Sequence, residues 1–268
     1  MVKRRNEQPI VWTDVAWPCD GVLDSWTAYR PVTMDRIAEL THQFSQIESS
    51  IREAEVVAHR PSRSVHLLAV SKTKPASDLE VLARLGQKSF GENYVQEAVD
   101  KIHALNEFDI EWHYIGHIQS NKTKIIATEF DWVHTVDREK IAIRLNEART
   151  GKPLNILIQV NVDLAETKSG VAPNDLKQLA EAIWALPNLR LRGLMSIPDP
   201  VSDEDLKRAH QKLKSLFDEL KQSHPASEIF DTLSMGMTND LELAVAEGST
   251  MVRIGTALFG ARPPKDSV

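Results

Sequence analysis

The sequence predicts an α/β fold, a (β/α)8 TIM barrel in which parallel strands alternate with helices. Short aliphatic runs rich in branched residues are typical of buried parallel strands, and here they alternate with helical patterns. About eight such repeats lie between residues 65 and 260, and this number favours closure of the sheet into a barrel. The alternative is a doubly wound open sheet, which is disfavoured because no Gly-x-Gly-x-x-Gly turn follows the first strand.

A first helix is expected to begin at Met34, directly after Thr33, whose hydroxyl is of the kind that caps helices. Apolar residues recur there at steps of three and four, as one face of a helix requires; they are Ile37, Leu40, Phe44, Ile47 and Ile51. Strands are then expected at 65–71, 88–91, 111–115, 131–135, 154–162, 190–196, 229–234 and 251–254. Helical patterns separate them at 77–85, 94–106, 121–129, 138–149, 174–185, 203–222 and 240–247.

Three segments are expected along the chain. Residues 1–33 form an irregular leader with no helical or strand period, and it holds Trp12, Trp17 and Trp26. Polar residues follow its basic start where a secretory signal needs an apolar core, so we do not interpret it as a signal peptide. Residues 34–262 are expected to form the barrel, and residues 263–268 a short tail.

Composition excludes several classes of partner. The net charge is −6 and the basic residues are dispersed, so no nucleic-acid partner is expected. No apolar stretch is long enough to span a membrane, so no membrane partner is expected. Cys19 is the sole cysteine, which rules out an intrachain disulfide. His113 and His117 are four residues apart but flank a strand end, so no metal site is predicted. We therefore expect a cytoplasmic protein.

Lys72 is the leading candidate for chemistry. It follows the aliphatic run 65–70, so it lies where the active sites of α/β barrels are built, at the carboxyl end of a strand. Packing among apolar neighbours would lower the pKa of its ammonium group, and a free amine can form a Schiff base with an aldehyde. A solvated lysine that merely ends a strand is the alternative interpretation.

Two strand–loop units near the C-terminus are candidates for binding phosphate. The strand 229–234 runs into Ser234-Met-Gly-Met-Thr-Asn-Asp240, and the strand 251–254 runs into Gly255-Thr-Ala-Leu-Phe-Gly260. Glycine lets backbone amides approach an anion closely, and hydroxyl groups add hydrogen-bond donors. The loops after strands seven and eight are the usual phosphate site of such barrels. The sequence therefore predicts a phosphate group beside these loops.

Several motifs, taken in order, carry a family resemblance. They are Leu67–Pro75, Phe90–Glu97, Trp112–Gly116, Gln119–Lys122, Lys168–Gly170, Gly193–Met195, Ser234–Met237 and Gly248–Thr256. The chain from about Met34 to Arg262 resembles the pyridoxal phosphate homeostasis proteins, the YggS/PROSC family. This resemblance implies the N-terminal barrel of alanine racemase (PLP fold type III), as a single domain without the C-terminal β domain.

The resemblance also implies a cofactor and the residues that bind it. Lys72 would carry pyridoxal 5′-phosphate (PLP) as an internal aldimine, a Schiff base with its aldehyde. Ser234, Gly255 and Thr256 would hold the phosphate, and Arg253 would lie against the pyridine nitrogen. The alternative for Arg253 is an ion pair with an acid from the next strand.

Two further residues have less specific signals. Asn93, at the end of the second strand, would face the cofactor near its ring, although an Asn at this junction is often an N-cap. Lys168 is a candidate second lysine at the barrel mouth, and a solvated loop lysine is an equally good interpretation.

The resemblance favours a carrier over an enzyme. Carbanion-forming PLP enzymes commonly place a carboxylate at the pyridine nitrogen, whereas a charged arginine keeps that nitrogen unprotonated and weakens the electron sink. We therefore expect no catalytic residues and a role in intracellular PLP (vitamin B6) and amino-acid homeostasis. A low-activity PLP-dependent amino-acid racemase and a protein-interaction scaffold remain alternatives. PLP-dependent apo-enzymes are candidate partners, and a monomer is expected.

Overall fold

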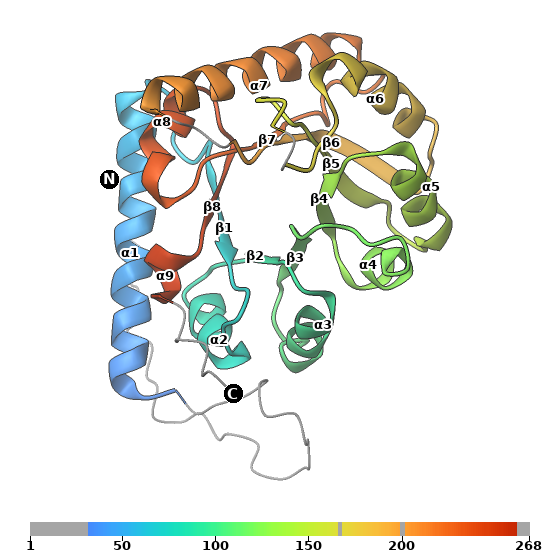
Figure 1. The fold of residues 1–268 in the computed structure, drawn as a ribbon. Coiled ribbons are helices and arrows are strands. Elements are labelled where there is room, and N and C mark those ends of the chain that lie inside the picture. Colours follow the sequence, from blue (N-terminus) through green and yellow to red (C-terminus); the bar gives the residue numbers. More distant parts are fainter. Residues whose placement is uncertain (1–31, 166–167, 199–201, 262–268) are drawn as a thin grey trace, which may run out of the picture.

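The computed structural model describes residues 32–165, 168–198 and 202–261. The predicted tail and nearly all of the predicted leader lie outside this described part. Within it, eight strands form a closed parallel barrel in the order β1-β2-β3-β4-β5-β6-β7-β8, as predicted. Helices surround the barrel, and the long helix α1 runs along its outside next to α8 and α9 (Figure 1). The (β/α)8 prediction is confirmed.

The strands have the following bounds: β1 His66–Val70, β2 Ser89–Glu92, β3 Glu111–Tyr114, β4 Trp132–Val136, β5 Leu154–Gln159, β6 Leu189–Met195, β7 Thr232–Ser234 and β8 Met251–Ile254. The α-helices are α1 Met34–Val57, α2 Ala76–Arg84, α3 Val95–Ala104, α4 Thr123–Glu129, α5 Glu139–Ala148, α6 Leu176–Trp184, α7 Asp203–Ser223, α8 Leu241–Ala246 and α9 Thr256–Phe259. Short 3-10 turns, η2 Pro173–Asp175 and η3 Thr238–Asp240, precede α6 and α8.

Helix α1 begins as the sequence predicts. The hydroxyl oxygen of Thr33 accepts a hydrogen bond from the backbone N–H of Arg36 at 3.2 Å, which is the expected N-cap. Most of the predicted apolar face is buried against the barrel; its buried members are Ile37, Leu40, Ile47 and Ile51. Burial of such side chains stabilises the fold by about 1.5–3 kcal/mol each. This packing fixes α1 against α2, α8 and α9 on the outside of the barrel.

Two predicted strands are three residues longer than the observed ones. The strand predicted at 229–234 begins at Thr232, because the N–H groups of Ile229 and Phe230 bond to carbonyls in the preceding turn. The strand predicted at 154–162 ends at Gln159. The chain beyond it pairs instead with Val171, through an isolated bridge from Val160. In both cases hydrogen bonds to a neighbouring turn or loop replace the ladder that apolar composition suggested.

Strands β1 and β8 pair over four residues, from His66 opposite Met251 to Ala69 opposite Ile254. This pairing closes the barrel between the beginning and the end of the domain. As a result, the loops that follow β1 and β8 leave the barrel side by side, although nearly 200 residues separate them in sequence. Among the described residues, no helix combines the length and the apolar character that crossing a bilayer requires.

Candidate functional site

Five of the six predicted site residues lie at the carboxyl ends of strands, and the sixth, Arg253, lies within β8. Lys72 follows β1, Asn93 follows β2, Ser234 ends β7, and Gly255 and Thr256 follow β8. Because the strands are parallel, these ends meet at one mouth of the barrel. The structure therefore brings together residues from the first half and the last quarter of the chain.

Lys72 lies on a tight turn directly after β1. The N–H of Ser71 donates to the carbonyl of Gly91, and the N–H of Lys74 donates to the carbonyl of Ser71, both at 3.0 Å. Between them Thr73 has a φ of +65°, in the left-handed region that a β-branched residue rarely adopts. Lys72 itself is half-buried. The turn thus presents Lys72 at the rim, neither in the core nor fully in solvent.

The loop after β8 packs directly on the end of β1. A Cβ atom added to Gly255 would lie 3.3 Å from the carbonyl oxygen of Val70, so the absence of a side chain permits this close approach. Thr256 begins α9 and its side chain is exposed. The first N–H groups of a helix have no acceptor within it, so Thr256 and Ala257 offer backbone donors here. The amine of Lys72 and these donors therefore belong to adjacent loops.

Arg253 is a buried cation that is held by carbonyl and hydroxyl oxygens. Its register opposite Leu68 of β1 directs it into the barrel, where it is 5% exposed. It donates to the Ser234 carbonyl at 2.8 Å, the Ser234 hydroxyl oxygen at 2.9 Å and the Ser196 carbonyl at 2.8 Å. Burial lowers the pKa of its guanidinium to about 10, so it stays charged at neutral pH.

The alternative prediction for Arg253, an ion pair with a carboxylate, is not observed: within the described ranges no acidic side chain lies at ion-pair distance from it. Asp240 acts on it through charge alone and raises its pKa slightly against the effect of burial. Carbonyl and hydroxyl oxygens solvate a cation but do not neutralise it. The interior therefore retains a positive charge that a negative or electron-rich ligand would compensate.

Asn93 does not cap helix α3. Tyr94 occupies the N-cap position and makes no side-chain capping bond. The side-chain oxygen of Asn93 is buried and has no hydrogen-bond partner in the described structure. The backbone of Asn93 is packed against Gly116, where an added Cβ would lie 2.2 Å from the Asn93 carbonyl oxygen. An unsatisfied buried amide oxygen at the mouth is a feature that a ligand or a water molecule would satisfy.

Two histidines form a pair inside the barrel that the sequence did not indicate. His113 Nδ1 on β3 lies 2.9 Å from His134 Nε2 on β4, and both side chains are fully buried. The His113 ring also stacks on the Trp132 ring, and the two ring centroids lie 5.2 Å apart. Burial lowers the pKa of His113 to about 3 and lowers that of His134 as well, with further contributions from His113 and Arg253. The pair is therefore neutral, with one ring donating to the other.

A buried ion cluster beside Lys72 was also missed. Lys101 on α3 is 3% exposed and its ammonium contacts Glu92 and Glu97 at 2.7 and 2.6 Å. Glu92 in turn accepts a hydrogen bond from the Ser71 hydroxyl at 2.6 Å. Both acids belong to the motif Phe90–Glu97, so the sequence drew attention to them. It does not show with which lysine they form ion pairs.

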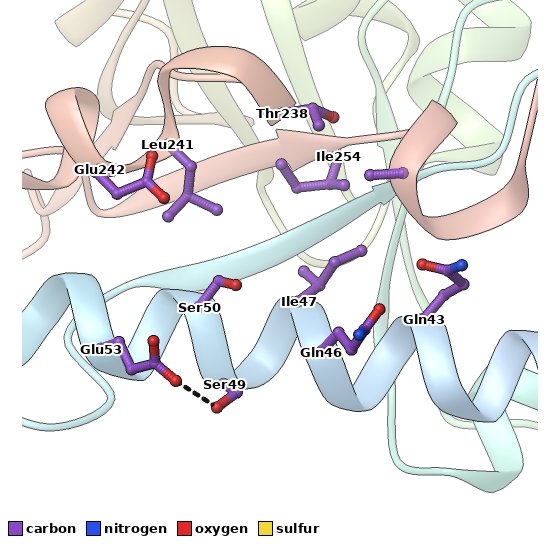
Figure 2. A pocket seen from close by; sticks show the side chains of 11 residues that line it. Gln43, Gln46, Ile47, Ser49, Ser50, Glu53, Thr238, Leu241, Glu242 and Ile254 are labelled. Carbon is purple, nitrogen blue, oxygen red and sulfur yellow. Dashed lines mark hydrogen bonds between the residues drawn. The ribbon is translucent and has the colours of Figure 1, made fainter.

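Lys168 lies half-buried in the loop after β5, where its carbonyl accepts from Asn161 at 3.4 Å. A separate groove of about 510 Å³ lies outside the barrel, between α1 and the segment that includes η3, α8 and β8 (Figure 2). Of the described residues, those lining this groove include none of the six predicted cofactor residues. The chemistry described above therefore lies at the barrel mouth, away from this groove.

Comparison with known proteins gives a consistent result. The family model "Alanine racemase, N-terminal domain" matches residues 44–263. A pyridoxal phosphate homeostasis protein of Pasteurella multocida is 52% identical over 228 residues, which cover 83% of this chain and 97% of that protein. PipY of Synechococcus elongatus, whose structure has PLP bound, is 36% identical with a TM-score of 0.69, covering 78% of this chain and 100% of PipY. An unknown protein from Bifidobacterium adolescentis is 32% identical, with a TM-score of 0.82, covering 87% and 99% of the two chains.

Proposed function

The chain belongs to the family of pyridoxal phosphate homeostasis proteins, and on this premise we propose that it holds PLP covalently on Lys72. When bound, PLP supplies an aldehyde carbon to which a lysine nitrogen can bond with loss of water. In this proposal the chain stores and releases PLP in the cytoplasm, as a monomer. It thereby contributes to vitamin B6 and amino-acid homeostasis.

One observation carries the proposal: the buried positive charge of Arg253, which no carboxylate among the described residues contacts, lies inside the same mouth that Lys72 borders. PLP has an electron-rich ring nitrogen and a phosphate dianion, and both suit a site with excess positive charge and hydroxyl donors. Arg253 would face the ring nitrogen. The Ser234 hydroxyl would donate a hydrogen bond to the phosphate, while its oxygen accepts a hydrogen bond from Arg253. Gly255 and Thr256 would bind the phosphate through backbone and hydroxyl groups.

Asn93 would complete the site near the ring. Its side-chain oxygen is a hydrogen-bond acceptor without a partner in the described structure, so it would accept a hydrogen bond from a hydroxyl group of the ligand. Such a bond would satisfy a group that otherwise costs about 1–3 kcal/mol to leave buried and unpaired. The residues present therefore fit PLP, because the cation of Arg253 and the unsatisfied oxygen of Asn93 each have a counterpart on the cofactor.

The same residues favour a carrier over a racemase. Arg253 remains charged because its pKa is about 10, and a positive neighbour disfavours a proton on the ring nitrogen. Without that proton the ring withdraws electrons weakly, so bond cleavage in a bound amino acid gains little stabilisation. We propose that delivery of PLP to PLP-dependent apo-enzymes, and not turnover of an amino acid, is the function of the site.

The proposal is tested by loading the protein with PLP and incubating it with a panel of L-amino acids. A spectral change without sustained product supports the carrier. Continuing formation of D-amino acid or keto acid over many turnovers would instead support the racemase alternative. Absence of a PLP chromophore after loading would favour the scaffold alternative and contradict the proposal as a whole.

A further inference from the structure

The Lys101 ammonium is a buried cation whose three N–H donors are all used. It donates to the Ser71 carbonyl at 2.8 Å, to Glu92 at 2.7 Å and to Glu97 at 2.6 Å. The Lys101 side chain is 4% exposed and that of Glu92 is fully buried. Groups of this kind hold their geometry because separating them would leave a charge in a low-dielectric interior.

The cluster of Lys101, Glu92 and Glu97 forms hydrogen bonds with the residues on both sides of Lys72. Before it, the carbonyl of Ser71 accepts from Lys101, and the hydroxyl of Ser71 donates to Glu92. After it, the N–H of Thr73 donates to the same Glu97 oxygen that contacts Lys101, at 2.5 Å. The residues that flank Lys72 are therefore tied to one buried ammonium group.

The conformation of the turn needs such a restraint. Thr73 has a φ of +65°, which costs a β-branched residue free energy unless its surroundings hold it there. The bond from the Thr73 N–H to Glu97 supplies that restraint. Burial raises the pKa of Glu92 against the opposing effect of Lys101, so the carboxylate depends on this ammonium to remain ionised.

We propose that Lys101, acting through Glu92 and Glu97, is a positioning residue that aims the Lys72 amine at the aldehyde of PLP. This inference rests on the proposed function. Covalent attachment replaces the C=O double bond of the aldehyde with a C=N double bond to the Lys72 nitrogen, and the aldehyde oxygen leaves as water with the two protons of the neutral amine. Such a step depends steeply on the approach of the two atoms, because a misplacement of about 1 Å can cost on the order of a hundredfold in rate.

Glu97→Ala is the primary variant. The Glu97 side chain is 27% exposed, so its removal leaves Glu92 and Lys101 paired while it releases Thr73. Glu139→Ala is the matched control. Glu139 and Glu97 are both acids in the first turn of a helix, of α5 and α3 respectively, but Glu139 is exposed to solvent. Lys101→Met is the second variant: it removes the hydrogen bond to the Ser71 carbonyl and the cation that Glu92 and Glu97 share.

Three quantities are measured on full-length protein. The first is the rate of covalent attachment of PLP, from borohydride quenching at a series of times and intact mass. The second is the distribution of the trapped label among lysines, from peptide mapping. The third is the affinity for 4′-deoxypyridoxine 5′-phosphate, which lacks the aldehyde and reports the phosphate and ring contacts alone.

We expect attachment to slow by about tenfold or more in Glu97→Ala, and further in Lys101→Met. Part of the label should move from Lys72 to other lysines. The affinity for 4′-deoxypyridoxine 5′-phosphate should stay within about twofold of wild type, because the contacts of Arg253, Ser234 and Thr256 are unchanged. Glu139→Ala should match wild type in all three measurements.

Three results would overturn the inference. Attachment at the wild-type rate with the wild-type label distribution in both variants would show that the cluster does not aim Lys72. An equal loss of affinity for the aldehyde-free ligand, or failure of Glu97→Ala to fold, would assign the cluster to the fold in general. If wild-type protein carries no label on Lys72, the proposed function itself is wrong, and this outcome is distinct from the other two.

Discussion

Acidification should destabilise the protein through the buried histidine pair. His113 has an unperturbed pKa of 6.5 that burial lowers to about 3, so between these values the unfolded chain binds a proton that the folded protein does not. A depressed folded-state pKa contributes stability above pH 6.5, and this stability is lost as the pH falls towards 3. The loss is about 1.4 kcal/mol per pH unit for one such group.

At pH 5 the pH lies 1.5 units below 6.5, so His113 alone accounts for a loss of about 2 kcal/mol. His134, whose pKa is also lowered, adds to this. A total of this size is a large fraction of the 5–15 kcal/mol that stabilises a typical domain. Urea unfolding at pH 7, 6 and 5 measures it, with His113→Gln as the test variant and exposed His42→Gln on α1 as the control.

His113→Gln should flatten the dependence of the free energy of unfolding on pH by about 1.4 kcal/mol per unit, because one titrating group is removed. His42→Gln should leave that slope unchanged. Equal slopes for wild type and His113→Gln between pH 6.5 and 5 would refute the conclusion that His113 is buried in its neutral form.

Three further outcomes are expected. Thr256→Val should weaken PLP binding by about tenfold or more, because a hydrogen bond to a charged group is worth about 1.5–3 kcal/mol. Binding of pyridoxal, which lacks the phosphate, should be affected much less. Parallel titrations with both ligands measure this, and equal weakening of both would place the phosphate elsewhere. Asp240→Asn should lower the free energy of unfolding at pH 7, because hydrogen bonds from His210 and from the Met237 N–H outweigh burial and lower the pKa of Asp240. The difference in unfolding free energy from wild type should shrink as the pH falls below about 4. A difference that does not depend on pH would contradict this expectation. Deletion of residues 1–32 should leave the melting temperature and PLP binding nearly unchanged, because that sequence has no periodic apolar face; a large fall in melting temperature would contradict the expectation.

The alternation of strands and helices was predictable because it depends on local composition. Strands such as β1 and β5 are largely buried, so they appear in the sequence as aliphatic runs. Strand ends were less predictable. At Ile229 and Phe230 the residues are as apolar as those of a strand, but their N–H groups bond within a turn, and only tertiary hydrogen bonding distinguishes the two cases.

The candidate site was predictable where its chemistry lies in loop motifs, and not where it depends on side-chain direction. Gly255 and Thr256 follow a strand in an order that indicates phosphate binding. The pairing of His113 with His134 arises because both point into the barrel from neighbouring strands, a fact of register that the sequence does not contain. The contact of Lys101 with Ser71 joins residues 30 positions apart through a buried network, which no spacing rule indicates.

The position of the covalent label tests the central claim most directly. PLP-loaded wild-type protein is reduced with borohydride and digested, and the labelled peptide is identified by mass, with Lys72→Ala treated in parallel. The account predicts that the label lies mainly on Lys72 and that this labelled peptide is lost in Lys72→Ala, even if a neighbouring lysine such as Lys74 or Lys168 takes up some PLP in the variant. A label carried mainly by a lysine other than Lys72 in the wild-type protein would contradict it.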